Sequence, residues 1–147
     1  RVLTQAGTLI AAGAATATVG LIALTKGSID AADNLLALSK TAETAAAADD
    51  VDAQVQWRSV RAPIVARMGD MTVAEALARE ATQLAHSAEA PLLQAEAHSD
   101  LAEVLQLAGK LDEARTEFLQ AAKLSKTKGD IVSAARAVLR AQRLSSI

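Results

Sequence analysis

Apolar residues recur along most of the chain at the three- and four-residue spacing of an amphipathic helix. In one segment, Val73, Leu77 and Leu84 share a face, while Glu75 and Arg79 form an i,i+4 pair on the opposite face. Such spacing, read with capping signals, predicts seven helices. Their expected ranges are 3–25, 29–47, 52–68, 72–87, 91–108, 111–127 and 130–144.

The composition supports an all-α fold and excludes several kinds of chemistry. Hydrophobic residues make up 51% of the 147 positions, with alanine dominant, and the chain has only 7 Gly and 2 Pro. An all-β fold needs more β-branched and aromatic residues and more turn formers. Trp57 and Phe118 are the sole aromatic residues of the Phe, Tyr and Trp class, and we expect both in the core. Cysteine is absent, which excludes disulfides and thiolate catalysis.

Three segments align on Gly27, Gly69 and Gly109, which are 42 and 40 residues apart. A large apolar residue follows each glycine by two positions, a candidate helix N-cap by three, and an alanine by five; a small residue precedes it by seven. These sets are Ile29, Met71, Leu111; Asp30, Thr72, Asp112; Ala32, Ala74, Ala114; and Gly20, Ala62, Ala102. Each glycine is therefore predicted to be the turn of a helical hairpin. The hairpins cover about 3–47, 52–87 and 91–127, followed by a final helix at 130–144.

This pattern resembles the tetratricopeptide repeat. The bulky position of the second helix holds Leu36, Ala78 and Phe118, and the following small position holds Ser39, Ala81 and Ala121. The terminal proline of that repeat is missing, and the period is longer than the usual ~34 residues.

Further strings resemble the C-terminal repeat region of large bacterial signalling and transcriptional regulators, which carry cyclase-like or DNA-binding and ATPase modules upstream. They are residues 49–52, 57–62, 100–105, 108–114 and 129–136. The resemblance implies a cytoplasmic docking or sensing array and transfers no catalytic residue. Because the chain begins at Arg1 rather than Met, we also expect it to be part of a longer protein.

We therefore expect one all-α, tetratricopeptide-like domain over residues 1–147, with antiparallel hairpins stacked as a short right-handed solenoid. Its expected function is a non-catalytic scaffold that binds a partner protein or peptide. The alternative is a sensor that binds a small molecule in the solenoid groove. Neither an enzymatic activity nor a cofactor or metal is expected.

The resemblance implies that the first helix of each hairpin lines the concave face. By position, this assigns Gln56, Ser59, Pro63 and Arg67, and then Glu96, Ser99, Glu103 and Gln106, to a partner-binding groove. These polar side chains suit a groove that forms hydrogen bonds. The alternative is that they are simply the solvated side of each helix.

Other candidate chemistry has a simpler structural interpretation. Consecutive helical side chains such as His98, Ser99 and Asp100 point about 100° apart, so they do not form a hydrolase triad. His86 and His98 lack the spacing of paired metal ligands, and we expect surface or partly packed histidines. The acidic run 49–52 lacks the features of a calcium loop, and we interpret it as helix capping.

Charge is uneven along the chain. Residues 1–109 hold 7 basic and 13 acidic residues, whereas residues 110–147 hold 8 basic and 4 acidic ones. Arg136, Arg140 and Arg143 form a basic face of the last helix, for an acidic partner or simply for solvation. Nucleic-acid binding is not expected, because stacking aromatic residues and recognition motifs are absent.

The segment from Val2 to Thr25 has no charged residue, a length that would also suit a membrane span or a signal peptide. Its Ala, Gly and Thr content gives a weak drive for insertion, so we expect a buried first helix and no membrane association. Its apolar face includes Leu21 and Leu24, through which we expect self-association as a homodimer. We also predict a bend or break near Pro63 in the third helix.

Overall fold

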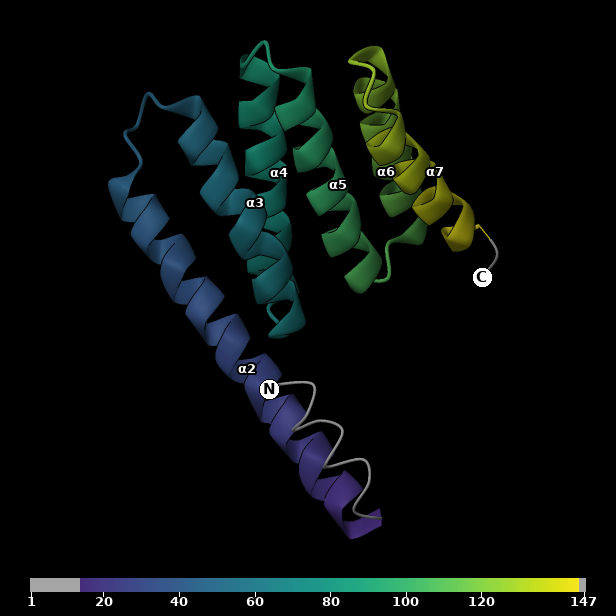
Figure 1. The fold of residues 1–147 in the computed structure, drawn as a ribbon. Coiled ribbons are helices and arrows are strands. Elements are labelled where there is room, and N and C mark those ends of the chain that lie inside the picture. Colours follow the sequence, from purple (N-terminus) through teal and green to yellow (C-terminus); the bar gives the residue numbers. More distant parts are fainter. Residues whose placement is uncertain (1–13, 146–147) are drawn as a thin grey trace. The chain divides into compact units, whose positions relative to one another are not determined.

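The computed structural model describes residues 14–145, with side chains from residue 30 onward. All regular structure in this range is helical, and no strand occurs in it. The helices are α2 (Ala14–Ala45), α3 (Val51–Arg67), α4 (Met71–Ser87), α5 (Pro91–Leu107), α6 (Leu111–Thr127) and α7 (Ile131–Leu144) (Figure 1). The chain divides into two compact units, Arg1–Leu35 and Leu36–Ile147, and α2 crosses the boundary between them.

The first predicted hairpin is wrong. One helix, α2, runs over residues 14–45, so the chain makes no turn at Gly27, and the described residues hold six helices rather than the expected seven. A glycine inside a helix costs only ~1 kcal/mol, and the alanine-rich flanks favour the helix. A turn at Gly27 would create two new helix ends, whose terminal N–H and C=O groups have no partners within the helix. Contacts between the two helices would have to offset that cost. The start of the predicted helix 3–25 lies outside the described residues.

The remaining five helices begin at 20-residue intervals, from residue 51 to residue 131. Every predicted boundary in this region agrees with the structure to within one residue. This part of the all-α prediction is confirmed, and the regular spacing gives the fold a repeat-like character.

Three of the four turns that join α3 to α7 contain a glycine with a positive φ angle. Gly69, Gly109 and Gly129 have φ angles of +98°, +76° and +78°. The residue after each donates its N–H to a carbonyl five positions back, as in Lys110 N–H to Leu105 O at 2.9 Å. This bond completes a Schellman-type helix end. The fourth turn, between α4 and α5, has no glycine, and Ala88 there is extended.

Aspartates cap three of these helices. Asp50 belongs to the predicted capping run 49–52, whereas Asp70 and Asp130 are not at the predicted cap positions. Side chains of Asp50, Asp70 and Asp130 accept hydrogen bonds from backbone N–H groups three residues later, at 3.0–3.1 Å. The expected caps Thr72 and Asp112 lie inside α4 and α6, because these helices begin directly after the residue that follows the glycine. The expected cap Asp30 lies inside α2. The capping interpretation of the acidic run 49–52 is confirmed for Asp50.

Pro63 does not end its helix, since α3 continues from residue 51 to residue 67. Of the predicted bend or break, the break is therefore wrong, and the bend stays a prediction. Both aromatic side chains lie in the core as expected: Trp57 is 6% exposed and Phe118 is fully buried. Small residues do much of the packing in the cluster that contains Phe118, where Ala102 and Ala114 are completely buried.

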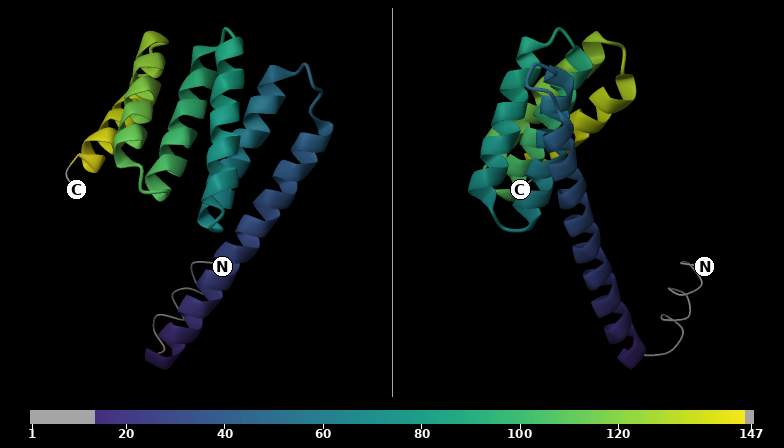
Figure 2. Two further views of the ribbon diagram at one scale, coloured as in Figure 1. Left: turned by 180° about the vertical axis from the view of Figure 1, so that it is seen from behind. Right: turned by 90° about the vertical axis from the view of Figure 1, so that its left-hand side faces the viewer.

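Packing joins the five helices at one end and leaves two groups at the other (Figure 2). α3 packs on α4 and α5, α5 packs on α6, and α6 packs on α7. The main core takes residues from all five helices and includes Leu101, Val104, Leu105 and Phe118. A second cluster joins α3, α4 and α5 around Val55, and a third joins α6 and α7 around Ala121.

Among the helices of residues 14–145, none has the length and apolar character needed to cross a lipid bilayer.

Candidate binding pocket between α5 and α7

A pocket of about 460 Å³ opens where the second and third clusters separate. It is lined by α5, α6 and α7 and by the N-cap of α7. Its residues are Leu92, Ala95, Glu96, Ser99, Asp100, Phe118, Ser125, Asp130, Ser133, Arg136, Ala137 and Arg140. The volume lies in the usual range of small-ligand sites, roughly 300–1,000 Å³.

The sequence of α5 explains why the helices separate here. Its C-terminal half has four buried apolar residues at 101, 102, 104 and 105, which extend the main core. Its N-terminal half instead turns Glu96, Ser99 and Asp100 toward the pocket. A dry core cannot form over these polar groups, because each would lose water without gaining a partner. The same helix therefore packs tightly at one end and borders a polar pocket at the other.

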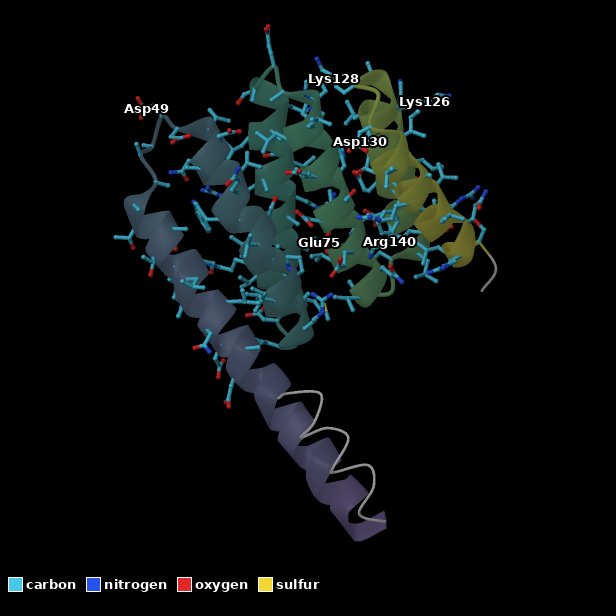
Figure 3. The ribbon with its side chains drawn as sticks, viewed as in Figure 1. Asp49, Glu75, Lys126, Lys128, Asp130 and Arg140 are labelled. Atoms are coloured by element: carbon cyan, nitrogen blue, oxygen red, sulfur yellow. The ribbon has the colours of Figure 1, made fainter. Side chains whose placement is uncertain are left out.

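Two pairs of side chains with opposite charges line the pocket, one pair from α5 and one from α7. We call Glu96 and Asp100 the α5 wall, and Arg136 and Arg140 the α7 wall. The members of each wall are four residues apart, and the two walls are separated by the 40 residues of two helix intervals. Two of the lining residues, Asp130 and Arg140, are labelled in Figure 3. No ion pair joins the two walls within the described residues.

Several opposite charges elsewhere on the molecule form direct ion pairs. Glu75 binds Arg79 at 2.8 Å and Lys110 at 2.9 Å, and these hydrogen bonds lower its pKa. Arg61 binds Glu43 at 2.7 Å. No such pair joins the α5 wall to the α7 wall in the described residues, although Arg140 lies 3.4 Å from Glu103, which is also on α5.

Asp100 has a strongly perturbed acidity. Burial raises its pKa to about 7, and the neighbouring carboxylates Glu103 and Glu96 act in the same direction. The Ser59 hydroxyl and the Arg140 guanidinium lower the pKa, but less. The Ser59 hydroxyl lies near enough to Asp100 to lower its pKa, but it makes no hydrogen bond of good geometry. The Ser59 oxygen is buried. Asp100 therefore changes charge near neutral pH, and it does so at the pocket.

Glu103 connects the pocket to the rest of the helical face. It binds Arg67 of α3, and its other oxygen lies 3.4 Å from Arg140 of α7. Arg140 also places its guanidinium carbon 4.4 Å from the ring centroid of Phe118. These contacts hold Arg140 in place at one end of the pocket, while Arg136 of the same wall is exposed.

The structure places the eight predicted groove residues in different surroundings. Glu96 and Ser99 line the pocket, and Arg67 and Glu103 form the ion pair described above. Ser59 is buried and Pro63 is half-buried, whereas Gln56 and Gln106 are exposed and do not line the pocket. Side chains at Leu21 and Leu24, expected to mediate self-association, lie outside those described.

Sequence reasoning missed part of the pocket. The sequence pattern assigns none of Asp100, Asp130 and Ser133 to a groove, yet all three line the pocket. It predicts a basic face of Arg136, Arg140 and Arg143, of which Arg143 is exposed and does not line the pocket. The available signal was the 40-residue register that relates positions 96 and 100 to positions 136 and 140.

The string His98-Ser99-Asp100 does not converge on one site. His98 is buried, with Nδ1 2.5 Å from Glu117 Oε2, and its Nε2 has no partner. It is more buried than the sequence suggested. His86 lies edge-on to it, with ring centroids 5.1 Å apart. Ser99 and Asp100 instead face the pocket, so these neighbours serve separate environments. Groups of three or more side chains suited to a metal ion are absent from the described part of the chain.

Comparisons with protein-family models, with curated proteins and with solved structures give no match for this chain.

Proposed function

We propose that this chain is a non-catalytic docking module whose α3, α5 and α7 face binds a segment of a partner polypeptide. The observation that carries the proposal is the polar pocket between α5 and α7, which lies beside the exposed Arg67–Glu103 ion pair. Together they give a polar surface that crosses three helices. A bound segment would find hydrogen-bonding groups along this surface and a depression for one or more of its side chains.

The broader setting is part of the same proposal. We infer a tetratricopeptide-like solenoid that acts as a scaffold within a cytoplasmic bacterial signalling protein. The 20-residue spacing of the helices and the positive-φ glycines support the repeat, and the sequence resemblance supports the setting. The separate surroundings of His98 and Asp100 support a role without catalysis.

A peptide-display library selected against the whole chain tests the docking role. Selected peptides should lose binding to Arg136→Glu and to Glu103→Lys, which alter the pocket and its connection to α3. Arg143→Glu is the matched control, because this arginine lies on the same helix but does not line the pocket. Peptides that bind all three variants equally well would place the binding surface elsewhere.

A small-molecule sensor is the second candidate, and the volume of the pocket favours it. Native mass spectrometry of the purified protein separates the two candidates. A molecule that co-purifies with the protein, and is lost from the Arg136→Glu variant, would support the sensor. A selected peptide with the variant profile described above would support docking.

A further inference from the structure

We propose that the pocket between α5 and α7 binds an amphoteric ligand, whose cationic group faces the α5 wall and whose anionic group faces the α7 wall. This inference rests on the proposed function, because it names the chemistry by which the pocket would hold part of a docked partner. A lysine and a carboxylate of one peptide, or a free amino acid, would present these groups.

The first argument comes from the separation of charge across the pocket. The α5 wall contributes carboxylates and the α7 wall contributes guanidiniums. The remaining charged group of the lining is the carboxylate of Asp130, which accepts the backbone N–H of Ser133 as the N-cap of α7 and lies near enough to Arg136 to interact with its charge. Direct ion pairs neutralise facing charges elsewhere, as at Arg58 and Glu80, 3.1 Å apart. Glu96 and Arg136 are exposed and unpaired within the described residues, so both remain available to a ligand. A ligand with one charge would satisfy one wall and leave the other unsatisfied.

The second argument comes from the apolar part of the pocket lining. Leu92 lines the pocket and is 47% exposed, so it presents an apolar surface beside the two walls, whereas Ala95, Phe118 and Ala137 also line the pocket but are almost completely buried. An apolar surface of this kind can cover a short hydrocarbon stem. The ligand that matches the whole pocket therefore has an apolar middle and opposite charges at its two ends.

A series of ω-amino acids provides a direct probe of this chemistry. We choose 4-aminobutanoate, 6-aminohexanoate and 8-aminooctanoate, which vary the separation of the charges, with hexanoate and hexylamine as singly charged controls. Binding to the full chain is followed by amide chemical-shift changes. At least one amino acid should bind about tenfold or more tightly than either control, as expected for loss of one charged hydrogen-bonding group.

Variants then assign each end of the probe to a wall. Glu96→Gln should weaken binding of the best amino acid but leave hexanoate binding unchanged. Arg136→Gln should weaken binding of the amino acid but leave hexylamine binding unchanged. Arg143→Gln, on the same helix as Arg136 but outside the pocket, should change nothing. Because all three side chains are exposed, the variants should retain the thermal transition of the parent.

Asp100 supplies a further readout. Its charged or titratable neighbours are Glu96 and Glu103 on α5 and Arg140 on α7, with the Ser59 hydroxyl on α3. A bound ammonium group would favour the ionised carboxylate, so amino-acid binding should release a proton and tighten between pH 6 and pH 8. Hexanoate binding should weaken or stay constant over the same range.

Two results would overturn the inference: no probe binds, or the singly charged controls bind as tightly as the amino acids. The experiments also distinguish failure of the docking role from failure of the amphoteric pocket. If displayed peptides depend on Arg136 while the probes show no preference for two charges, docking stands and the amphoteric pocket falls. If the probes behave as expected and no peptide is selected, the pocket chemistry stands and the docking role falls.

Discussion

At the scale of single residues, the most informative side chain is Asp100, because burial raises its pKa from the usual value of 3.8 to about 7. The folded protein therefore holds this proton more tightly than the unfolded chain does. The resulting stabilisation is complete below about pH 4 and is lost as the pH rises to about 7. Above that range the folded state contains a poorly solvated carboxylate near Glu96 and Glu103.

Asp100→Asn should remove this dependence, because the amide has nearly the same shape and carries no charge. We expect the variant to be more stable than the parent by a few kcal/mol at pH 8, and about equally stable at pH 4. Thermal unfolding measured at intervals between pH 4 and pH 8 gives both values. A variant curve that follows the parent curve at a constant offset would contradict the assignment of this pH dependence to Asp100.

Ala114 tests the close packing of α6. It is completely buried in the main core, as the hairpin register predicted. Ala114→Glu would place a charged carboxylate among apolar neighbours, so we expect loss of the cooperative thermal transition. Ala76→Glu is the control, since this alanine is exposed on α4, and it should change the free energy of unfolding by no more than ~0.5 kcal/mol. Similar melting of both variants would contradict the packing at Ala114.

At the scale of elements, the sequence predicted five of the helices to within one residue. The reason is physical: apolar periodicity marks the buried face, and a glycine with positive φ ends the helix cheaply. Gly27-Ser28-Ile29 has the same local form as Gly129-Asp130-Ile131, yet only the second is a turn. Local chemistry permits a turn at both places, so the local sequence alone does not decide between a turn and a continuous helix.

Alanine substitution at the two kinds of glycine should therefore have opposite effects. Gly109→Ala should destabilise the protein by ~1–2 kcal/mol, because its φ of +76° is strained for a residue with a Cβ. No atom lies within 4 Å of a Cβ added there, so the cost is conformational rather than steric. Gly27→Ala should stabilise α2 locally by up to ~1 kcal/mol.

Amide hydrogen exchange of α2 and denaturant unfolding of the chain measure these two effects. The helix over residues 14–45 would be disproved if Gly27→Ala increased exchange on both sides of residue 27. Such a result would restore the hairpin that the sequence predicted.

At the scale of the whole molecule, the pocket arises from a change in packing along the helices. The sequence assigned Glu96 and Ser99 to one groove by their position in the repeat that it resembles, and both line the pocket. It did not reveal that α7 borders the same space, since this depends on where the cores around Val55 and Ala121 separate. The polar face of α5 can therefore be predicted from the sequence. That Arg136 and Arg140 line the same pocket as this face is known only from the tertiary structure.

This division of the core predicts two kinds of unfolding behaviour. Leu105 is completely buried in the main core, which takes residues from α3 to α7. Leu105→Ala should cost ~2–5 kcal/mol and increase amide exchange in all five helices by a similar factor. Val138 packs only against the cluster shared by α6 and α7. Val138→Ala should cost about 1 kcal/mol and increase exchange in α7 and the end of α6 alone.

Hydrogen exchange followed by mass spectrometry gives the effect of each variant helix by helix. The pocket lies beside the cluster that Val138→Ala weakens, so this variant should also reduce binding of the ω-amino acids while α3 and α4 keep their protection. If Leu105→Ala increased exchange in α5 alone, the five helices would not form one cooperative unit. If Val138→Ala increased exchange equally from α3 to α7, the cluster of α6 and α7 would not be separable from the main core, and the pocket would not mark a boundary between them.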